Sequence, residues 1–325
     1  MMRLALAPVL AFAMASGALA QSGAEGRWPD KPIRMIVPLP AGSAVDIVAR
    51  LICTKLSERI GQTIVIDNRS GASGAIASDV VAKSAPDGYT LGMATSTTHV
   101  TTAILNSKLP YDPVKDFVPV ALIGIVPYVL AVSPQLPAKN LAELLALAKA
   151  KPGTLNYSSV GLGSLAHLAT EMMSTMAGIK MNHIPYRASG PAILDMSENR
   201  IDLSIGVLGT FLSLIRDGKI RALAVTTDKR VDTVPDVPTM AEAGLPGFEA
   251  SLWFAVVAPA AIPQPVLARL NKEINAILAQ PEIKKSLAAQ AVDVETSDPE
   301  KLRARIRADI EKWRDIAAKA GVKSE

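Results

Sequence analysis

The stretch from residue 33 to residue 52, IRMIVPLPAGSAVDIVARLI, constrains the fold more than any other part of the chain. Its first five residues form an apolar run rich in β-branched side chains, which is typical of a buried strand. Pro38 and Pro40 end this strand, because neither can donate a hydrogen bond to a sheet and each fixes its own φ angle. Ser43 is a suitable helix N-cap, so the stretch predicts a strand, a tight loop and a helix.

The loop of this unit also has a chemical property. The first amides of a helix lack intrahelical partners and lie at the positive end of the helix dipole. Gly42 leaves the backbone open to an approaching anion, and Asp46 stands three residues after Ser43, in the capping-box position. No phosphate-loop lysine follows Gly42, so a nucleotide P-loop is excluded. A site for a small anion and an ordinary turn between strand and helix both stay open.

A second loop of the same kind follows the strand predicted at residues 155–158. Its sequence at 158–164, SSVGLGS, combines small residues with Ser164 as the N-cap of the next helix. The segment GLGSLA also fits the dinucleotide fingerprint, but Lys180 stands about where an acidic residue should hold a ribose. Two such loops, one in each half of the chain, suit a small dianion or a molecule with a carboxylate.

The rest of the chain alternates between strand and helix patterns. We predict strands at 63–67, 89–94, 118–123, 127–133, 182–185, 201–206, 221–226 and 252–258, and helices at 75–83, 141–150, 191–199, 210–217, 265–279, 281–289 and 299–318. The first three strands of the chain are separated by helices, which implies a parallel sheet with right-handed crossovers.

A run of hydroxyl side chains, TSTTHVTT at 95–102, follows the third strand. Ligands bind beyond the carboxyl ends of strands in open parallel sheets, so Ser96 and Thr97 are candidate ligand contacts. The alternative, which we weigh equally, is that these hydroxyls cap the next helix.

The first twenty residues have the pattern of a secretory signal. Arg3 supplies the positive charge, residues 4–14 are apolar, and the A-x-A motif at 18–20 predicts cleavage after Ala20. The alternative is a retained N-terminal anchor. We expect a periplasmic protein, exported by this signal. The chain carries a single cysteine, Cys53, which cannot form an internal disulfide, and an exported chain without a disulfide fits a bacterial periplasm as well as any compartment. Cys53 itself is predicted to be a small core hydrophobe.

Composition and motifs exclude several classes of function. The net charge is +4, and +3 without Arg3, with lysines and arginines dispersed, so a nucleic-acid footprint is absent. A secreted hydrolase is the rival class, yet no Gly-x-Ser-x-Gly elbow surrounds any serine. The three histidines, His99, His167 and His183, have no metal-ligand spacing. We therefore predict no catalytic residue, no metal and no cofactor.

Two of these histidines have competing interpretations. His167 lies one turn into the helix after the second loop, where it can contact a ligand or make a structural hydrogen bond. His183 lies on a strand and is predicted to belong to the core.

The sequence resembles the periplasmic substrate-binding proteins of tripartite tricarboxylate transporters, also called the Bug family. The resemblance covers nearly the whole mature chain and is carried by WPDKPIRMIVPLPAGSAVDIVAR, IDNRSGASGAIA, PDGYTLGM, YDPVKDFVPV, YSSVGLGSLAHLA, HIPYRASGPAILDM, GKIRALAVTTDKR, DVPTMAEAGLPGFEA and WFAVVAPA. It implies a small carboxylate ligand, which is a di-, tri- or aromatic carboxylate, and membrane components of such a transporter as partners. A periplasmic sensor that feeds a signalling receptor would have the same fold and is the alternative.

The resemblance also implies an architecture and a site. The fold expected is an α/β, two-domain periplasmic binding protein of type II-like topology, with a Venus-flytrap cleft and crossing hinge strands near Pro127 and Trp253. We place the first domain at 21–125 plus 251–325 and the second at 126–250, and expect a monomer that is not membrane-embedded. The predicted ligand-binding residues are Leu39, Ala41, Gly42, Ser43, Ser96, Thr97, Ser159, Val160, Gly161, Gly163, Ser164, His167, Tyr186 and Gly206.

Two positions depart from the family pattern. The first loop has Gly42-Ser43-Ala44 where the family usually has successive glycines. Gly206 stands where many members have an aspartate that can meet an amino group of the ligand. The absence of this charge argues against an amino-acid ligand and predicts more room for a simple or aromatic carboxylate.

Overall fold

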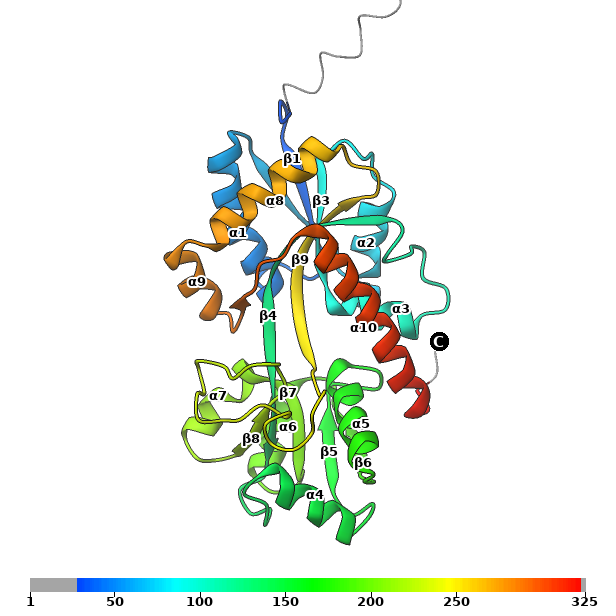
Figure 1. The fold of residues 1–325 in the computed structure, drawn as a ribbon, viewed down its shortest axis with the longest axis vertical. Coiled ribbons are helices and arrows are strands. Elements are labelled where there is room, and N and C mark those ends of the chain that lie inside the picture. Colours follow the sequence, from blue (N-terminus) through cyan, green and yellow to red (C-terminus); the bar gives the residue numbers. More distant parts are fainter. Residues whose placement is uncertain (1–27, 323–325) are drawn as a thin grey trace, which may run out of the picture.

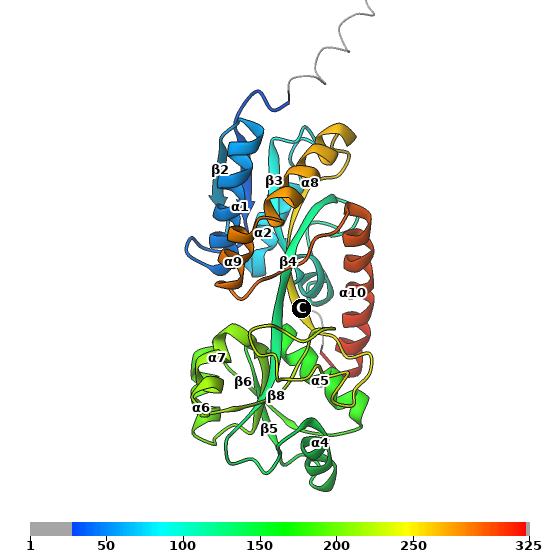
Figure 2. The ribbon, with the colours of Figure 1, turned by 60° about the vertical axis from the view of Figure 1, so that its left-hand side comes forward.

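The computed structural model describes residues 28–322, which form two lobes joined by two long strands (Figure 1). The strands make one sheet in the order β2-β1-β3-β9-β4-β7-β5-β6, and β8 and the short β10 (Asp293–Val294) also pair with β4. Helices cover the strands of both lobes (Figures 1 and 2). The predicted α/β class with two lobes is confirmed.

The sheet of the first lobe starts with β1 (Ile33–Val37), β2 (Ile64–Asn68) and β3 (Thr90–Thr95). β1 pairs in parallel with both β2 and β3, which confirms the parallel arrangement expected from alternating strands and helices. The helices of this lobe are α1 (Ala44–Ile60), α2 (Ala75–Ala82), α8 (Gln264–Leu278) and α9 (Pro281–Ala288), with a short 3₁₀ turn, η1 (Ala72–Gly74), before α2. One apolar face of α1 packs into the same core as α8 and the strands.

The second lobe repeats this plan. β5 (Asn156–Ser159) pairs in parallel with β6 (Asn182–Pro185) and β7 (Leu203–Val207), and β8 (Arg221–Val225) runs antiparallel to β4. Its helices are α4 (Leu141–Ala150), α5 (Leu165–Ala177), α6 (Ser189–Ser197) and α7 (Leu208–Arg216). The parallel strands of each lobe therefore present their carboxyl ends, and the loops that follow them, at one edge.

The connecting strands differ from the prediction. The two apolar runs predicted as separate strands form one strand, β4 (Phe117–Val132). It pairs with β9 (Ser251–Pro259) as far as Pro127, with β7 from Tyr128 and with β8 from Val129. Proline fits inside this strand because it stands where β4 changes its partners. The domain boundary at 125/126 stays a prediction, and the change of partners lies two residues beyond it.

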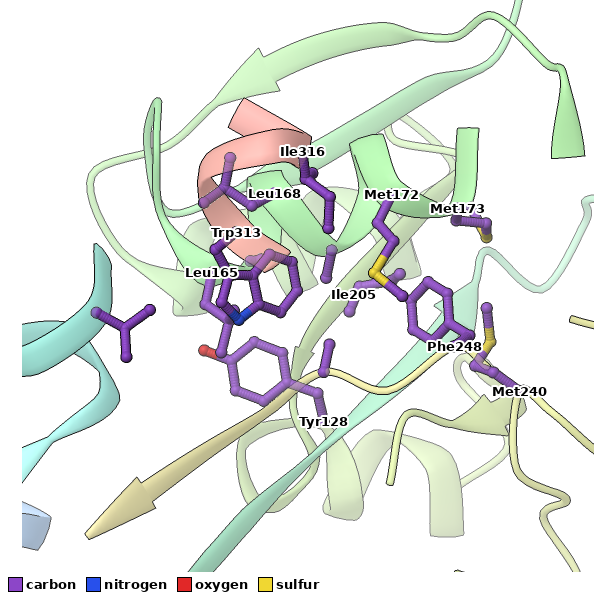
Figure 3. Close-up of a cluster of buried hydrophobic side chains, with 14 of the residues drawn as sticks. Tyr128, Leu165, Leu168, Met172, Met173, Ile205, Met240, Phe248, Trp313 and Ile316 are labelled. Atoms are coloured by element: carbon purple, nitrogen blue, oxygen red, sulfur yellow. The ribbon is translucent and has the colours of Figure 1, made fainter. Parts of the chain in front are cut away.

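The last helix, α10 (Pro299–Lys319), joins the lobes on one side. It runs from the first lobe down to α5 in the second (Figure 1). Figure 3 shows Trp313 and Ile316 of α10 among Leu165, Leu168 and Met172 of α5. Burial of a large apolar side chain contributes about 1.5–3 kcal/mol, so this contact fixes one side of the junction. The sequence did not predict that residues near 313 would pack on the second lobe.

Two further expectations concern the N-terminus and the cysteine. The predicted signal segment and its cleavage site lie outside the described residues. Between residues 28 and 322, no helix has both the length and the apolar character needed to cross a bilayer. Cys53 is buried in α1, as predicted, and burial raises the pKa of its thiol to about 12.

Candidate ligand-binding site

The first predicted loop, residues 39–43, connects β1 to α1. Ser43 is the N-cap of α1, and its Oγ accepts a hydrogen bond from the Asp46 amide at 3.4 Å. The Asp46 carboxylate accepts from the Gly42 amide at 2.9 Å, so the capping box closes one residue earlier than predicted. Gly42 has a φ of +84°, which glycine adopts without strain. Its amide is occupied within the loop.

Asp46 is held by hydrogen-bond partners that local sequence does not indicate. The residue is only 1% exposed, and its carboxylate accepts from Arg50 Nε and Asn68 Nδ2, each at 2.9 Å. Asn68 also donates to the Leu39 carbonyl at 2.8 Å, so it ties the loop to α1. Burial alone would raise the pKa of Asp46, but the hydrogen bonds from Arg50, Gly42 and Asn68 and the charge of Arg50 lower it to about 2. Asp46 is therefore a carboxylate at neutral pH.

The second predicted loop, residues 159–164, connects β5 to α5. Ser164 is the N-cap of α5, and its Oγ donates to the Gly161 carbonyl at 2.7 Å. The Gly161 amide donates to Ser159 Oγ at 3.2 Å. These bonds hold the loop in a tight turn and use the Gly161 amide internally, so Gly161 offers no free donor either.

His167 occupies in α5 the position that Asp46 occupies in α1. Its amide donates to Ser164 Oγ at 3.3 Å, and its Nδ1 accepts from the Gly163 amide at 3.1 Å. The structural hydrogen bond at the helix start, one of the two interpretations of His167, is therefore present. Because Nδ1 is an acceptor, the ring proton lies on Nε2.

The amides that stay free lie next to the predicted glycines. In the described part of the chain, Ala44 and Val45 in the first turn of α1 have no hydrogen-bond partner, and the same holds for Leu165 and Ala166 in α5. The Val160 amide is also unpartnered within residues 28–322. Each loop therefore presents free donors at the positive end of a helix.

His183 lies beside the second loop and corrects a prediction. It is half-buried on β6 rather than part of the core, and its Nε2 lies 2.7 Å from Ser159 Oγ. Its ring stacks on His167 at 4.2 Å and on Tyr157 at 4.9 Å between centroids. Burial, and then the neighbouring His167, lower the pKa of His183 to about 4. Burial also lowers the pKa of His167, so both rings are neutral at neutral pH. Within residues 28–322, no group of three or more histidine, cysteine or acidic side chains could hold a metal ion.

In the hydroxyl run at 95–102, some side chains cap the next helical segment and one is left without a partner. Thr95 and Thr98 exchange hydrogen bonds between side chain and amide at 3.0 and 3.1 Å, so they cap the segment that follows. Ser96 is buried, and its Oγ has no partner in the described chain. Thr97 begins a π-helical turn, η2 (Thr97–Thr101), which α3 (Thr102–Leu105) continues. Such turns are frequent at functional sites.

The helical segment η2–α3 lies beside the second loop and is linked to the start of the first. A β-carbon added to Gly163 would overlap the Leu105 side chain, at the end of α3. A β-carbon added to Gly74 would lie 3.0 Å from Pro38 and 2.5 Å from Thr98, so Gly74 lies between η2 and Pro38, the residue before the first loop.

The remaining predicted residues lie around the second loop. The Tyr186 amide donates to the Ser159 carbonyl at 2.9 Å, and its hydroxyl donates to Asp195 at 2.5 Å. Burial, followed by the hydrogen bond with Asp195, raises the pKa of Tyr186 to about 12. Its hydroxyl is therefore engaged within the second lobe.

Gly206 lines a cavity of about 90 Å³ together with Ser159 and Val160. A β-carbon at position 206 would lie 2.6 Å from the Phe211 ring, so this ring takes the place that a side chain there would use. The room expected for a simple or aromatic carboxylate stays a prediction, and the cavity beside Gly206 is where it would lie.

Two α/β lobes joined by long strands, with a helix N-terminus from each lobe at the junction, define the class of periplasmic binding proteins. The model of the tripartite tricarboxylate transporter family receptor, TctC, matches residues 48–322. The chain belongs to this family. It is 37% identical over 319 residues to Protein BugT of Bordetella pertussis, a match that covers 98% of each chain.

Solved structures support the same assignment. The R. palustris protein Rpa4515 with adipate is 38% identical, covers 92% of this chain and 100% of its own, and gives a TM-score of 0.75. A TctC solute-binding protein from Polaromonas, with no ligand, is 25% identical, covers 90% of this chain and 100% of its own, and gives a TM-score of 0.83.

Proposed function

We propose that this chain binds a small carboxylate between its two lobes and delivers it to the membrane components of a tripartite tricarboxylate transporter. The observation that supports the proposal is the pair of matched loops, one in each lobe, each followed by a helix whose first-turn amides are free. Neither loop contains a lysine or arginine, so backbone donors would neutralise the ligand.

Backbone donors of this kind can supply enough free energy to bind a carboxylate without a lysine or arginine. A hydrogen bond to a charged group contributes about 1.5–3 kcal/mol, and a helix dipole about 0.3–1 kcal/mol. About four such contacts offset an association cost of several kcal/mol and leave a micromolar Kd. The unpartnered hydroxyl of Ser96, beside η2, is a further donor that a ligand would satisfy.

Exposed apolar side chains on both loops support closure around the ligand. Leu39 in the first loop is 43% exposed, and Val160 and Leu162 in the second are 45% and 74% exposed. Closure of the lobes around the ligand would remove part of this apolar surface from water, which favours the closed form. Ligand would then favour a closed form, because only that form lets both loops contact it.

In this proposal the two lobes rotate relative to one another about the strands that connect them. The flexible elements in this proposal are β4 and β9, whose register shifts between Leu122 and Gly124.

Binding rather than catalysis is part of this proposal. Ser159 and His183 lie at hydrogen-bond distance, but among residues 28–322 no carboxylate is hydrogen-bonded to His183. Ser159 also donates to the Gly161 carbonyl at 3.0 Å, so it is a loop contact and not an activated nucleophile. We further propose that the mature, periplasmic protein begins at Gln21, is a monomer, and consists of a first domain (21–125 plus 251–325) and a second domain (126–250).

The test is calorimetric titration of the mature chain with adipate, succinate, malate, citrate and benzoate, followed by small-angle scattering with and without the tightest ligand. We expect at least one micromolar carboxylate and a smaller radius of gyration with ligand. Absence of binding by every carboxylate would overturn the proposal. Uptake of the labelled ligand by cells that carry the membrane components, with and without this chain, tests delivery.

A further inference from the structure

We infer that the second lobe contains a specificity pocket that accepts the uncharged, apolar body of the carboxylate and rejects an amino group, with Phe211 as the residue that sets this selectivity. The inference rests on the proposed function, because it concerns how the same site chooses among carboxylates.

The pocket is continuous with the second loop. Its cavity of about 90 Å³ begins at Ser159 and Val160, includes Ala166 in the first turn of α5, and reaches Phe211 in α7. A water molecule needs about 10–15 Å³ measured in this way, so there is room for several non-hydrogen atoms. A carboxylate held by the free amides of Val160, Leu165 and Ala166 would point the rest of the molecule into this cavity.

The pocket has no group that could neutralise an ammonium ion. Thirteen residues line it, and none is charged. Three helices, α5, α6 and α7, begin at residues that line it or adjoin them, so the positive ends of three helix dipoles lie there. The hydroxyls of Ser204 and Thr210 donate to the carbonyls of Ser158 and Val207, at 3.1 and 2.7 Å. An ammonium group that moved from water into this pocket would find only neutral acceptors and the positive ends of helix dipoles. Its transfer would therefore cost free energy.

Phe211 excludes the side chain that could change this. A β-carbon at position 206 would lie 2.6 Å from Phe211 Cε2 and 2.9 Å from Cζ, and the Phe211 side chain is almost fully buried. An acidic side chain at 206 could face a ligand amine only if the ring moved away. Gly206 and Phe211 thus act as a pair: the glycine lets the ring lie against β7, and the ring makes the wall of the pocket apolar.

The first experiment compares carboxylates that differ only by an amino group. Calorimetry with the mature chain uses three pairs: succinate and aspartate, glutarate and glutamate, and 3-phenylpropionate and phenylalanine. For every pair in which binding is measured, we expect the amine-free member to bind at least about 100-fold more tightly, since an unpaired buried charge costs several kcal/mol. Equal affinity within such a pair would overturn the inference.

The second experiment tests whether substitutions at positions 206 and 211 change the preference for amine-free carboxylates. In the double variant Gly206→Asp, Phe211→Ala the shortened side chain makes room for the new carboxylate, so we expect the preference against amines to shrink at least tenfold. Ile220→Ala is the matched control, because Ile220 is buried in the same core cluster as Phe211 but does not line the pocket. It should lower the melting temperature and keep the wild-type preference.

The milder variant Phe211→Leu keeps the inference testable if the double variant does not fold. We expect Phe211→Leu to lower affinity for 3-phenylpropionate more than for succinate. An unchanged ranking of ligands in Phe211→Leu and in the double variant, with carboxylates still bound, would overturn this inference and leave the proposed function standing. Failure of every carboxylate to bind the wild type would overturn both.

Discussion

In the first lobe the Gly42 amide donates to Asp46, and in the second lobe the Gly163 amide donates to His167. Both acceptors stand three residues after a serine N-cap, at the third position of the helix. The backbone plan is thus shared, whereas the charge differs. Asp46 carries a full negative charge beside the N-terminus of α1, while His167 is neutral at the N-terminus of α5.

This difference separates the tasks of the two loops. The carboxylate of Asp46 already offsets the positive end of the α1 dipole, and Arg50 compensates that carboxylate. The positive end of α5 has no such internal anion at this position. We therefore expect the second loop to anchor the carboxylate of the ligand and the first loop to close over it.

The largest expected effect comes from Gly163→Asp. Gly163 has a φ of +71° and lies against Leu105, so an aspartate there strains the backbone, forces the Leu105 side chain to move and adds negative charge at the start of α5. We expect calorimetry to show at least a 100-fold loss of affinity, equivalent to about 3 kcal/mol. Gly153→Asp is the control, because Gly153 has a φ of +73° with open space around it. Wild-type affinity in Gly163→Asp would remove the second loop from the site.

A second prediction concerns pH, because the groups beside the two loops change the stability of the protein over different pH ranges. Unfolded histidines titrate near pH 6.5, whereas folded His183 titrates near pH 4. Between these values the unfolded chain binds more protons, so the free energy of unfolding falls as the pH is lowered from 6.5 to 4. The full shift corresponds to about 3 kcal/mol, and because His183 is only half-buried, solvent screening reduces its contribution to about 1–2 kcal/mol. The groups that face His183 are Tyr157, His167 and, through its charge, Glu171.

The measurement is urea unfolding of wild type and His183→Gln between pH 7 and pH 4.5. Burial also lowers the pKa of His99 and His167, so only the difference between the two proteins reports on His183. The first loop behaves differently, because the pKa of Asp46 is about 2 and its contribution is lost only below about pH 4. Parallel pH profiles for wild type and His183→Gln would contradict the prediction.

Much of this site could be predicted from local sequence. Proline and glycine mark the end of β1, and serine N-caps mark the starts of α1 and α5, because capping and turn preferences act over a few residues. The alternation of strands and helices predicts parallel sheets, because a helix between two strands carries the chain back to the same end of the sheet. These signals located both loops before any contact between the lobes was known.

The contacts between distant segments could not be predicted in this way. Asn68 reaches the first loop only because β2 pairs beside β1, and His183 meets Ser159 only because β6 pairs beside β5. The Phe211 ring against Gly206 and the continuous strand through Pro127 likewise depend on packing between elements. Polar residues at the ends of adjacent parallel strands are the signal that could have indicated Asn68 and His183.

A third prediction exchanges the distinguishing residue between the loops. His167→Asp gives the second loop the acceptor of the first, so the Gly163 amide keeps a partner while a negative charge is added at the α5 N-terminus. We expect carboxylate affinity to fall about tenfold at pH 7.5, equivalent to about 1.4 kcal/mol. His167→Asn is the matched control, since it is neutral and can accept the same hydrogen bond. Equal affinities for His167→Asp and His167→Asn would show that charge at this position does not matter.

The smallest effects are expected from the two N-caps, and they test whether the loops are equivalent. Ser43 makes one long hydrogen bond, at 3.4 Å, whereas Ser164 accepts at 3.3 Å and also donates at 2.7 Å to Gly161. Ser43→Ala and Ser164→Ala should each lower the free energy of unfolding by about 1 kcal/mol, the usual cost of a lost N-cap.

Affinity should separate the two variants even though stability does not. Ser164→Ala releases the turn that presents the free amides of α5, so we expect a loss of about five- to tenfold, against about twofold for Ser43→Ala. Ser164→Thr keeps the hydroxyl and should restore binding. Equal losses in the two alanine variants would mean that both loops grip the ligand alike, and the division into an anchoring loop and a closing loop would have to be abandoned.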